Sequence, residues 1–229
     1  MRNYKLYFVA LCMLMMIATS VSAGNWFTDI FGSTRGIRGS GDLVSEDRDV
    51  KAFSKIRTSG SYDIVVVVGR EQSIKVTFDD NLIDIIETDV KGRTLRIYSD
   101  ESYRTRRDCL IEITVPELKG FVAKGSGDIE IRNMDGEFFE FDLKGSGDIE
   151  MEGMIDELEI NLAGSGDIDA RDLIARDAIV VIKGSGDIRV HATEILDAAI
   201  YGSGDIDYYG KPDDVSKHVA GSGNIKRRK

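Results

Sequence analysis

The chain has 229 residues and, with 40 acidic against 30 basic side chains, a formal net charge of −10 at pH 7. A surface this acidic argues against nucleic acid as a partner. Two cysteines are too few for a disulfide framework, and the length fits one domain.

The first 23 residues have the composition of a secretory signal peptide. Arg2 and Lys5 precede the apolar run 6–17, and small residues at 21–23 provide a cleavage site after Ala23. The run is too short for a membrane-spanning helix, which needs about 20 apolar residues. We therefore expect an exported protein, in the periplasm, on the cell surface or secreted, with no transmembrane segment after cleavage.

The two cysteines have different expected roles. Cys12 lies inside the apolar run rather than after it, which argues against a lipid anchor. Cleavage leaves Cys109 as the remaining cysteine, so no intrachain disulfide can form. Because Cys109 stands in the strand-like run CLIEITV, we expect it to be a small buried hydrophobic residue.

A five-residue string recurs through the chain. It reads GSGDL at Gly39 and GSGNI at Gly221, and GSGDI at five positions between them: Gly125, Gly145, Gly164, Gly184 and Gly202. The copies from Gly125 onward begin 18 to 20 residues apart. This period is typical of the stacked rungs of a solenoid and too short for independent domains.

Apolar residues alternate with polar ones on both sides of each string, which predicts strands. One apolar column follows the string: Ile129, Ile149, Ile168, Ile188, Ile206 and Ile225. A further inward residue at a second corner is expected at Met134, Met154 and Leu173. A parallel β-helix stacks equivalent residues one rung apart and explains these columns; an antiparallel array with one hairpin per repeat is the alternative.

The domain plan follows from the repeat. After the signal peptide 1–23, a cap segment 24–38 precedes a β-helix over 39–229, with irregular rungs at 39–124 and regular rungs at 125–225. TSGSYDI at 58–64 resembles a degraded copy, strand-like runs occupy 64–68, 74–78, 95–98 and 110–115, and a helical turn is expected at 81–86. We expect about nine rungs of about 18–20 residues.

The repeats and the segments before them form a specific combination of motifs. GSGDI recurs with Ile or Val at alternate flanking positions, preceded by FSKIRTSGSYDIVVVVG, TLRIYS and IEITVPELKGF. Over about residues 39–225 this combination resembles the head GIN domain family of putative auto-transporter adhesins. The resemblance implies a right-handed β-helix fold and an exported, adhesin-like protein of a kind common in Bacteroidetes. It supplies no catalytic residues.

An acidic or amide side chain follows each glycine-serine-glycine string. We expect one column of these side chains: Asp128, Asp148, Asp167, Asp187 and Asp205, with Asn224 completing it and Asp42 in the N-terminal copy. Carboxylates about one rung apart repel each other unless N–H groups, solvent or a cation compensate them. We interpret each as a hydrogen-bond acceptor within its own turn, and a calcium ladder is the alternative.

The remaining motif searches favour a protein without catalytic residues or a cofactor. The strings lack the helix and lysine of a phosphate loop, and no GxSxG elbow is present. His191 and His218 join no cluster. We expect the glycines to allow positive φ and close approach of rungs, and the serines to form a hydroxyl ladder.

A charged loop at 99–108 interrupts the strand pattern and is the expected contact site, because long loops often carry function. Its candidate contact residues are Tyr103, Arg104, Arg106 and Arg107. Tyr208 and Tyr209 are further candidates for a carbohydrate surface. Some β-helices are polysaccharide lyases that combine calcium with a basic residue, so a carbohydrate-active enzyme is an alternative function.

The sequence thus predicts an exported, non-enzymatic β-helix that serves as an adhesin or as a cell-envelope structural or binding module. Its expected partner is a protein or glycan of the envelope or of a host surface; a lyase-like enzyme and a calcium-binding repeat protein are the alternatives. Unpaired strand edges make self-association possible. We expect the apolar segment 25–31 to cover one end and the basic residues 226–229 to protect the other.

Overall fold

A computed structural model describes residues 36–229 of the chain. The predicted signal peptide and cap residues 24–35 lie outside the described residues. The strands are β1 (Ile37–Arg38), β2 (Leu43–Asp47), β3 (Lys55–Ser59), β4 (Asp63–Val68), β5 (Ser73–Asp79), β6 (Glu87–Lys91), β7 (Thr94–Tyr98), β8 (Tyr103–Arg104), β9 (Leu110–Val115), β10 (Gly120–Gly125), β11 (Ile129–Gly145), β12 (Ile149–Leu162), β13 (Ile168–Ile182), β14 (Ile188–Ile200), β15 (Ile206–Tyr209), β16 (Asp214–Val219) and β17 (Ile225–Arg227). One short 3-10 helix, η1 (Ile83–Ile85), confirms the predicted helical turn.

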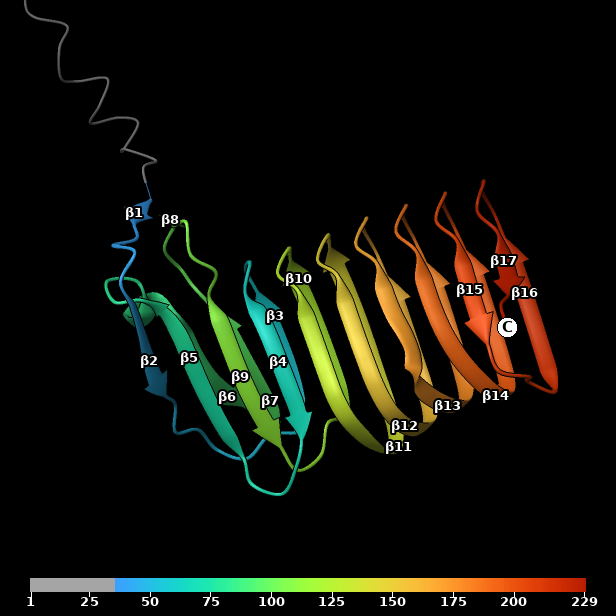
Figure 1. Cartoon of the computed structure of the whole chain (residues 1–229), viewed down its shortest axis with the longest axis horizontal. Coiled ribbons are helices and arrows are strands. Elements are labelled where there is room, and N and C mark those ends of the chain that lie inside the picture. Colours follow the sequence, from blue (N-terminus) through green and yellow to red (C-terminus); the bar gives the residue numbers. More distant parts are fainter. Residues whose placement is uncertain (1–35) are drawn as a thin grey trace, which may run out of the picture. The chain divides into compact units, whose positions relative to one another are not determined.

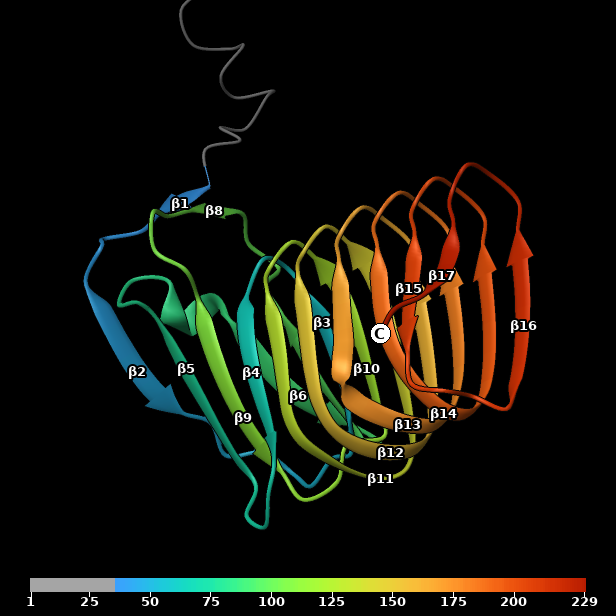
Figure 2. The same ribbon diagram turned by 45° about the vertical axis from the view of Figure 1, so that its right-hand side comes forward.

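The regular part of the chain coils into a β-solenoid, in which each coil has two arms joined at a glycine-serine-glycine corner (Figure 1). Successive coils pair in parallel and in register, so that Gly125 lies beside Gly145 and Ile129 beside Ile149. Figure 2 shows these coils stacked one after another up to β16 and β17. The parallel β-helix with rungs of about 18–20 residues is therefore confirmed, and the antiparallel array is wrong.

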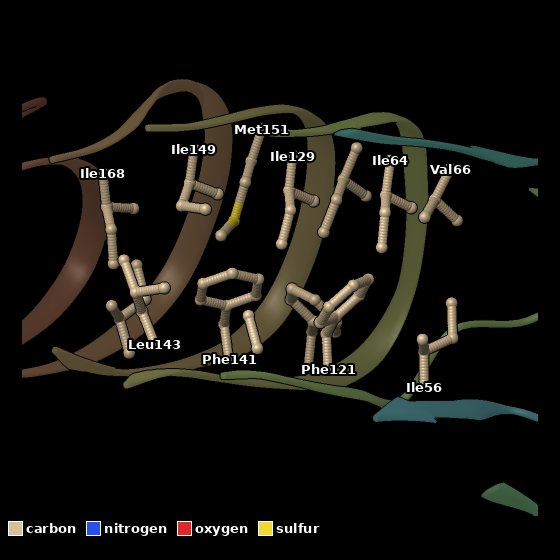
Figure 3. Packing of buried hydrophobic residues seen from close by; sticks show 14 of the residues in the cluster. Ile56, Ile64, Val66, Phe121, Ile129, Phe141, Leu143, Ile149, Met151 and Ile168 are labelled. Carbon is tan, nitrogen blue, oxygen red and sulfur yellow. The ribbon is translucent and has the colours of Figure 1, made fainter. Parts of the chain in front are cut away.

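The core lies between the two arms of the coils. The predicted isoleucine column is buried from Ile129 to Ile206, at no more than 4% exposure. The facing arm contributes Phe121 and Phe141, whose ring centroids lie 5.6 Å apart. Figure 3 shows the two columns pointing toward each other. Alternation in the sequence thus becomes a continuous apolar core along the stack.

The corner glycines are required because successive corners approach backbone to backbone. The N–H of Ser185 donates to the carbonyl of Gly164 on the preceding coil, at 2.9 Å. A Cβ on Gly184 would lie 2.0 Å from that same oxygen, and a Cβ on Gly186 would lie 1.9 Å from the carbonyl oxygen of Gly166. Positive φ, which we also expected, occurs at only some of the described corners: Gly60, Gly125 and Gly221.

The corner serines link the coils through the main chain. The N–H of Ser165 donates to the carbonyl of Gly145, and that of Ser203 to the carbonyl of Gly184. Within the described coils this main-chain ladder takes the place of the hydroxyl ladder that we expected. The serine side chain is therefore less constrained by stacking than the glycines on either side of it.

The corner aspartates also link one coil to the next. In five pairs of residues, the Oδ1 of the first residue accepts a hydrogen bond of 2.7–3.1 Å from the main-chain N–H of the second, which lies on the next coil. The pairs are Asp63 and Asp128, Asp128 and Asp148, Asp167 and Asp187, Asp187 and Asp205, and Asp205 and Asn224. The prediction of a bond within the same turn is thus wrong. These inter-coil bonds partly compensate the stacked charges. Asn224 ends the ladder without adding a carboxylate.

Residues 37–115 do not continue the coil in chain order. β3 and β4 stack directly on β10 and β11, which places Ile64 beside Ile129, and β7 and β9 form the next layer. β5 then pairs antiparallel with β9, β2 with β5, and β6 with β7. The solenoid consequently has about five turns, not the nine that we predicted.

The N-terminal GSGDL string is not a corner of the coil. It leads into β2, where Leu43 pairs antiparallel with Asp79 and is 50% exposed. Asp42 therefore lies outside the aspartate ladder, contrary to the prediction. Asp63, in the degraded copy at 58–64, occupies the ladder position instead.

The second corner differs from the prediction at one residue. Met134 and Leu173 are buried as expected, but Met154 is 63% exposed. A register shift places Gly153 opposite Met134, and a Cβ at Gly153 would lie 2.2 Å from the Met134 carbonyl oxygen. The residue after this glycine therefore turns outward, and Ile155 enters the core instead.

Replacement of a corner glycine by alanine is predicted to destabilise the solenoid. For Gly184→Ala the new Cβ would meet a backbone oxygen at 2.0 Å, and we expect a loss of about 2–4 kcal/mol in the free energy of unfolding. Gly136→Ala is the matched control, because its nearest atom would be a side-chain carbon at 3.4 Å. Chemical denaturation measures both changes, and equal effects would contradict the close-approach explanation.

Two substitutions of Asp187 are predicted to show whether the aspartate ladder affects stability through hydrogen bonds or through charge. Asp187→Ala removes the acceptor for the N–H of Asp205 and should cost about 1 kcal/mol. Asp187→Asn keeps an oxygen acceptor and removes one of the stacked charges, so we expect its stability to stay within about 0.5 kcal/mol of the original. If the asparagine variant lost as much as the alanine variant, the carboxylate charge itself would be essential.

Candidate functional site

The loop between β7 and β9 places a cluster of arginines beside the N-terminal strand. Within this loop, β8 pairs in parallel with β1, so that Arg38 and Arg104 are register partners. The N–H of Gly39 donates to the carbonyl of Arg104 at 2.9 Å and extends this pairing. Figure 1 shows β1 and β8 next to each other at the end opposite β17.

These segments enclose a pocket of about 680 Å³, the arginine pocket. It is lined by Arg38, Gly39, Ser40, Gly41, Arg104, Thr105, Arg106 and Arg107. Three of the four predicted contact residues therefore line one cavity. The fourth, Tyr103, packs inward, where its ring meets Phe78 edge to face at a centroid distance of 5.4 Å.

A buried carboxylate is bonded to two of the residues that line the arginine pocket. Asp79 is 0% exposed, and its Oδ1 accepts the N–H of Gly41 at 2.8 Å. Its Oδ2 accepts a hydrogen bond from the Thr105 hydroxyl. A Cβ on Gly39 would lie 2.0 Å from this carboxylate, so a glycine is needed where the strand crosses it. Asp79 thus ties the glycine-rich segment and the loop together.

The N–H groups of the Gly39–Gly41 segment are already used inside the protein. Gly39 bonds to the Arg104 carbonyl, Ser40 to Oδ1 of Asn81 at 2.9 Å, and Gly41 to Asp79. A phosphate loop presents such groups to its ligand. An anion in this pocket would therefore not be held by these three N–H groups, and the arginine side chains are the main donors that line it.

The arginines of this pocket differ from most others in the structure. Among residues 36–229, none of the four has an ion pair with a carboxylate, whereas many arginines elsewhere do: Arg48, Arg96, Arg132, Arg171, Arg176, Arg189 and Arg228. Outside the pocket, most described arginines are thus balanced locally. The pocket gathers four that are not.

Three other titratable groups packed beneath the loop, two tyrosines and a thiol, add no negative charge near neutral pH. Burial raises the pKa of the Cys109 thiol to about 12, and burial also raises the pKa values of Tyr62 and Tyr103. All three side chains are therefore neutral at pH 7. Cys109 is 2% exposed, which confirms it as a buried hydrophobic residue and makes it a poor nucleophile.

A second, acidic surface was missed in the sequence. A pocket of about 120 Å³ on the outer face of β11–β13 is lined by Glu130, Glu150, Glu152, Asp169 and Asp172, together with Arg171. Burial opposes ionisation of Asp169, but hydrogen bonds and charge from Arg171 lower its pKa overall. The sequence signal was the acidic residue after the isoleucine in successive rungs.

The candidate calcium ladder lies on the neighbouring edge of the coils. Asp63, Asp128 and Asp148 line a pocket of about 380 Å³ together with Glu130 and Glu150. Asp63 and Asp128 each use Oδ1 to accept an N–H from the next coil. No group of three or more His, Cys, Asp or Glu side chains within residues 36–229 is arranged to hold a metal ion.

The other residues considered in the sequence lie far along the chain from the arginine pocket. Nδ1 of His191 lies 3.3 Å from the carbonyl oxygen of Arg171, and the His218 ring packs near Tyr201, with centroids 5.5 Å apart. Tyr208 is buried at 7% exposure, so it is not a surface aromatic. The Arg171 guanidinium lies over the Tyr209 ring, with its Cζ 6.0 Å from the ring centroid.

The last coil is closed by charged residues. Lys217 points along the core column, where its Nζ lies 4.5 Å from the Tyr208 ring centroid and donates to the Ile225 carbonyl at 3.3 Å. In the basic terminus, Arg228 pairs with Asp207 at 2.8 Å. Such charges on terminal strands discourage edge-to-edge pairing.

The chain was compared with known protein families and structures. A family model described as putative auto-transporter adhesin, head GIN domain, matches residues 52–212. A putative adhesin from Bacteroides fragilis is 29% identical, with a TM-score of 0.69, 84% of this chain covered and 100% of that chain. A putative lipid binding protein from Parabacteroides distasonis is 31% identical, with a TM-score of 0.58 and 84% and 99% covered.

A putative adhesin from Parabacteroides merdae, at 20% identity and a TM-score of 0.56, shares the fold; 84% of this chain and 99% of that chain are covered. No curated protein matches the chain. In the described part of the chain, no helix has the length and apolar character needed to cross a membrane. The family match covers β3 to β15 and ends before β16 and β17, and the chain belongs to the head GIN domain family of putative auto-transporter adhesins.

Proposed function

We propose that this chain is an exported, non-enzymatic adhesin-like module that binds a glycan of the cell envelope or of a host surface through the arginine pocket. The observation that carries this proposal is the gathering of four arginines around one pocket in a chain of net charge −10. The adhesin family supports a binding role, and the signal-like residues 1–23 support export.

The lining of the arginine pocket supports binding without catalysis. It contains no histidine, cysteine or carboxylate, which are the usual acid and base groups, and arginine stays protonated near neutral pH. A lyase would need acidic calcium ligands beside its basic residue. The residues that line the two acidic pockets do not line the arginine pocket.

The name of the Parabacteroides distasonis protein makes lipid a second ligand to test. The arginine pocket contains no large apolar side chain that would hold an acyl chain. A lipid could meet it only through a charged headgroup. We therefore propose a glycan as the ligand and treat lipid vesicles as a comparison.

Charge reversal in the pocket is predicted to abolish binding. The purified mature chain is applied to an array of envelope and host-surface glycans, with and without calcium, and Arg104→Glu/Arg106→Glu should lose the signal because the two new carboxylates cancel the charge of the two remaining arginines of the lining. His191→Ala/His218→Ala is the control and should bind as the original chain does. Calcium should change neither the binding nor the melting temperature.

The same protein is incubated with acidic polysaccharides, and the unsaturated sugar ends that a lyase would produce are measured. We expect no unsaturated products. Unsaturated products that disappear on removal of calcium would establish the lyase instead. Binding that survives charge reversal would place the glycan site elsewhere on the molecule.

A further inference from the structure

We infer that the arginine pocket recognises a phosphomonoester group carried by a saccharide. The inference rests on the glycan-binding function proposed above and names the group that this pocket holds. It is drawn from the charge, the donors and the size of a single cavity lined by Arg38, Arg104, Arg106 and Arg107.

The charge of the pocket favours a dianion. Four arginines line it, against two carboxylates bonded to lining residues, Asp79 to Gly41 and Thr105 and Asp80 to Ser40, so a net positive charge remains. Like charges brought together in a concave site are costly unless an anion compensates them. A phosphomonoester carries about −1.5 to −2 at pH 7, whereas a sulfate ester or a uronate carries a single charge.

The hydrogen-bond donors of the pocket favour an anion that can accept two hydrogen bonds from one guanidinium group. Because the N–H groups of Gly39, Ser40 and Gly41 are engaged internally, the arginine side chains supply most of the donors left for a ligand. A guanidinium presents parallel N–H groups that match two oxygens of a phosphate or a carboxylate. A lysine of the same charge lacks this fork, so substitution by lysine tests the geometry.

The size and lining of the pocket favour a phosphate attached to a sugar. Ligand sites commonly measure about 300–1,000 Å³, and the arginine pocket, at about 680 Å³, has room for a sugar ring beside the phosphate. No aromatic side chain lines it, so a neutral sugar would find no ring face to pack against. The charged group must therefore supply most of the affinity.

Titration calorimetry of the mature chain with glucose 6-phosphate, glucose 6-sulfate, glucuronic acid and glucose tests this inference. Glucose 6-phosphate should bind most tightly, with an affinity that falls as salt is added, and glucose should not bind. Arg104→Gln/Arg106→Gln should weaken glucose 6-phosphate binding about tenfold or more. Arg104→Lys/Arg106→Lys should retain only part of the affinity.

The matched control is Arg57→Gln/Arg70→Gln, which removes the same charge from two exposed arginines outside the pocket. It should leave binding unchanged, and melting temperatures verify that every variant is folded. Equal loss in the control and pocket variants, or full affinity in the lysine variant, would overturn the inference.

Two further probes distinguish the source of the phosphate. Inorganic phosphate that binds as tightly as glucose 6-phosphate, or binding confined to phosphatidylcholine vesicles containing phosphatidic acid, would overturn the assignment to a saccharide. If glucose 6-phosphate fails to bind while array glycans still require Arg104 and Arg106, the phosphate assignment is wrong and the proposed function stands. If no array glycan binds either, the proposed function fails as well.

Discussion

The structure depends on one contact that is repeated at every regular corner. The carbonyl oxygen of a corner glycine accepts the serine N–H of the next coil, as Gly164 does from Ser185 at 2.9 Å. That oxygen then occupies the space where a side chain on Gly184 would begin. The hydrogen bond can therefore form only where the next corner residue has no Cβ, and this repeated contact keeps the coils in register. The aspartate ladder and the isoleucine column can form only because this register is kept.

Much of the fold could be predicted because a solenoid repeats its local environment. The isoleucine column and the buried Cys109 were both predictable from spacing and alternation. Met154 was not, because a register shift at Gly153 changes which residue faces inward. Such a shift depends on pairing between coils, which a single rung does not reveal.

The N-terminal third was harder to predict for a different reason. The GSGDL string at Gly39 matches the repeat well but leads from β1 into the antiparallel strand β2, whereas the weaker match at 58–64 forms a true corner. Local similarity does not specify which strand a segment will meet. The loop arginines were recognisable as candidates from the sequence, but Arg38, some 66 positions before Arg104, was brought to them only by the pairing of β1 with β8.

The scaffold and the proposed recognition site occupy different parts of the chain. In the repeat, many charges are paired with a nearby side chain or compensated by N–H groups of the next coil, and the carboxylates that remain form an acidic outer face. Where the repeat is interrupted, four arginines gather without carboxylate partners among the described residues. The same interruption that ends the regular ladder provides a basic pocket, whereas the pockets on the regular coils are acidic.

Amide hydrogen exchange of the native protein tests the central claim most directly. The N–H groups of Ser185 and Asp187 lie at an exposed corner, yet each donates to the preceding coil. The account predicts that they exchange as slowly as the amides of the neighbouring strands β13 and β14, and far more slowly than those of the exposed loop residues 100–102. Corner amides that exchange as fast as these loop amides would contradict it.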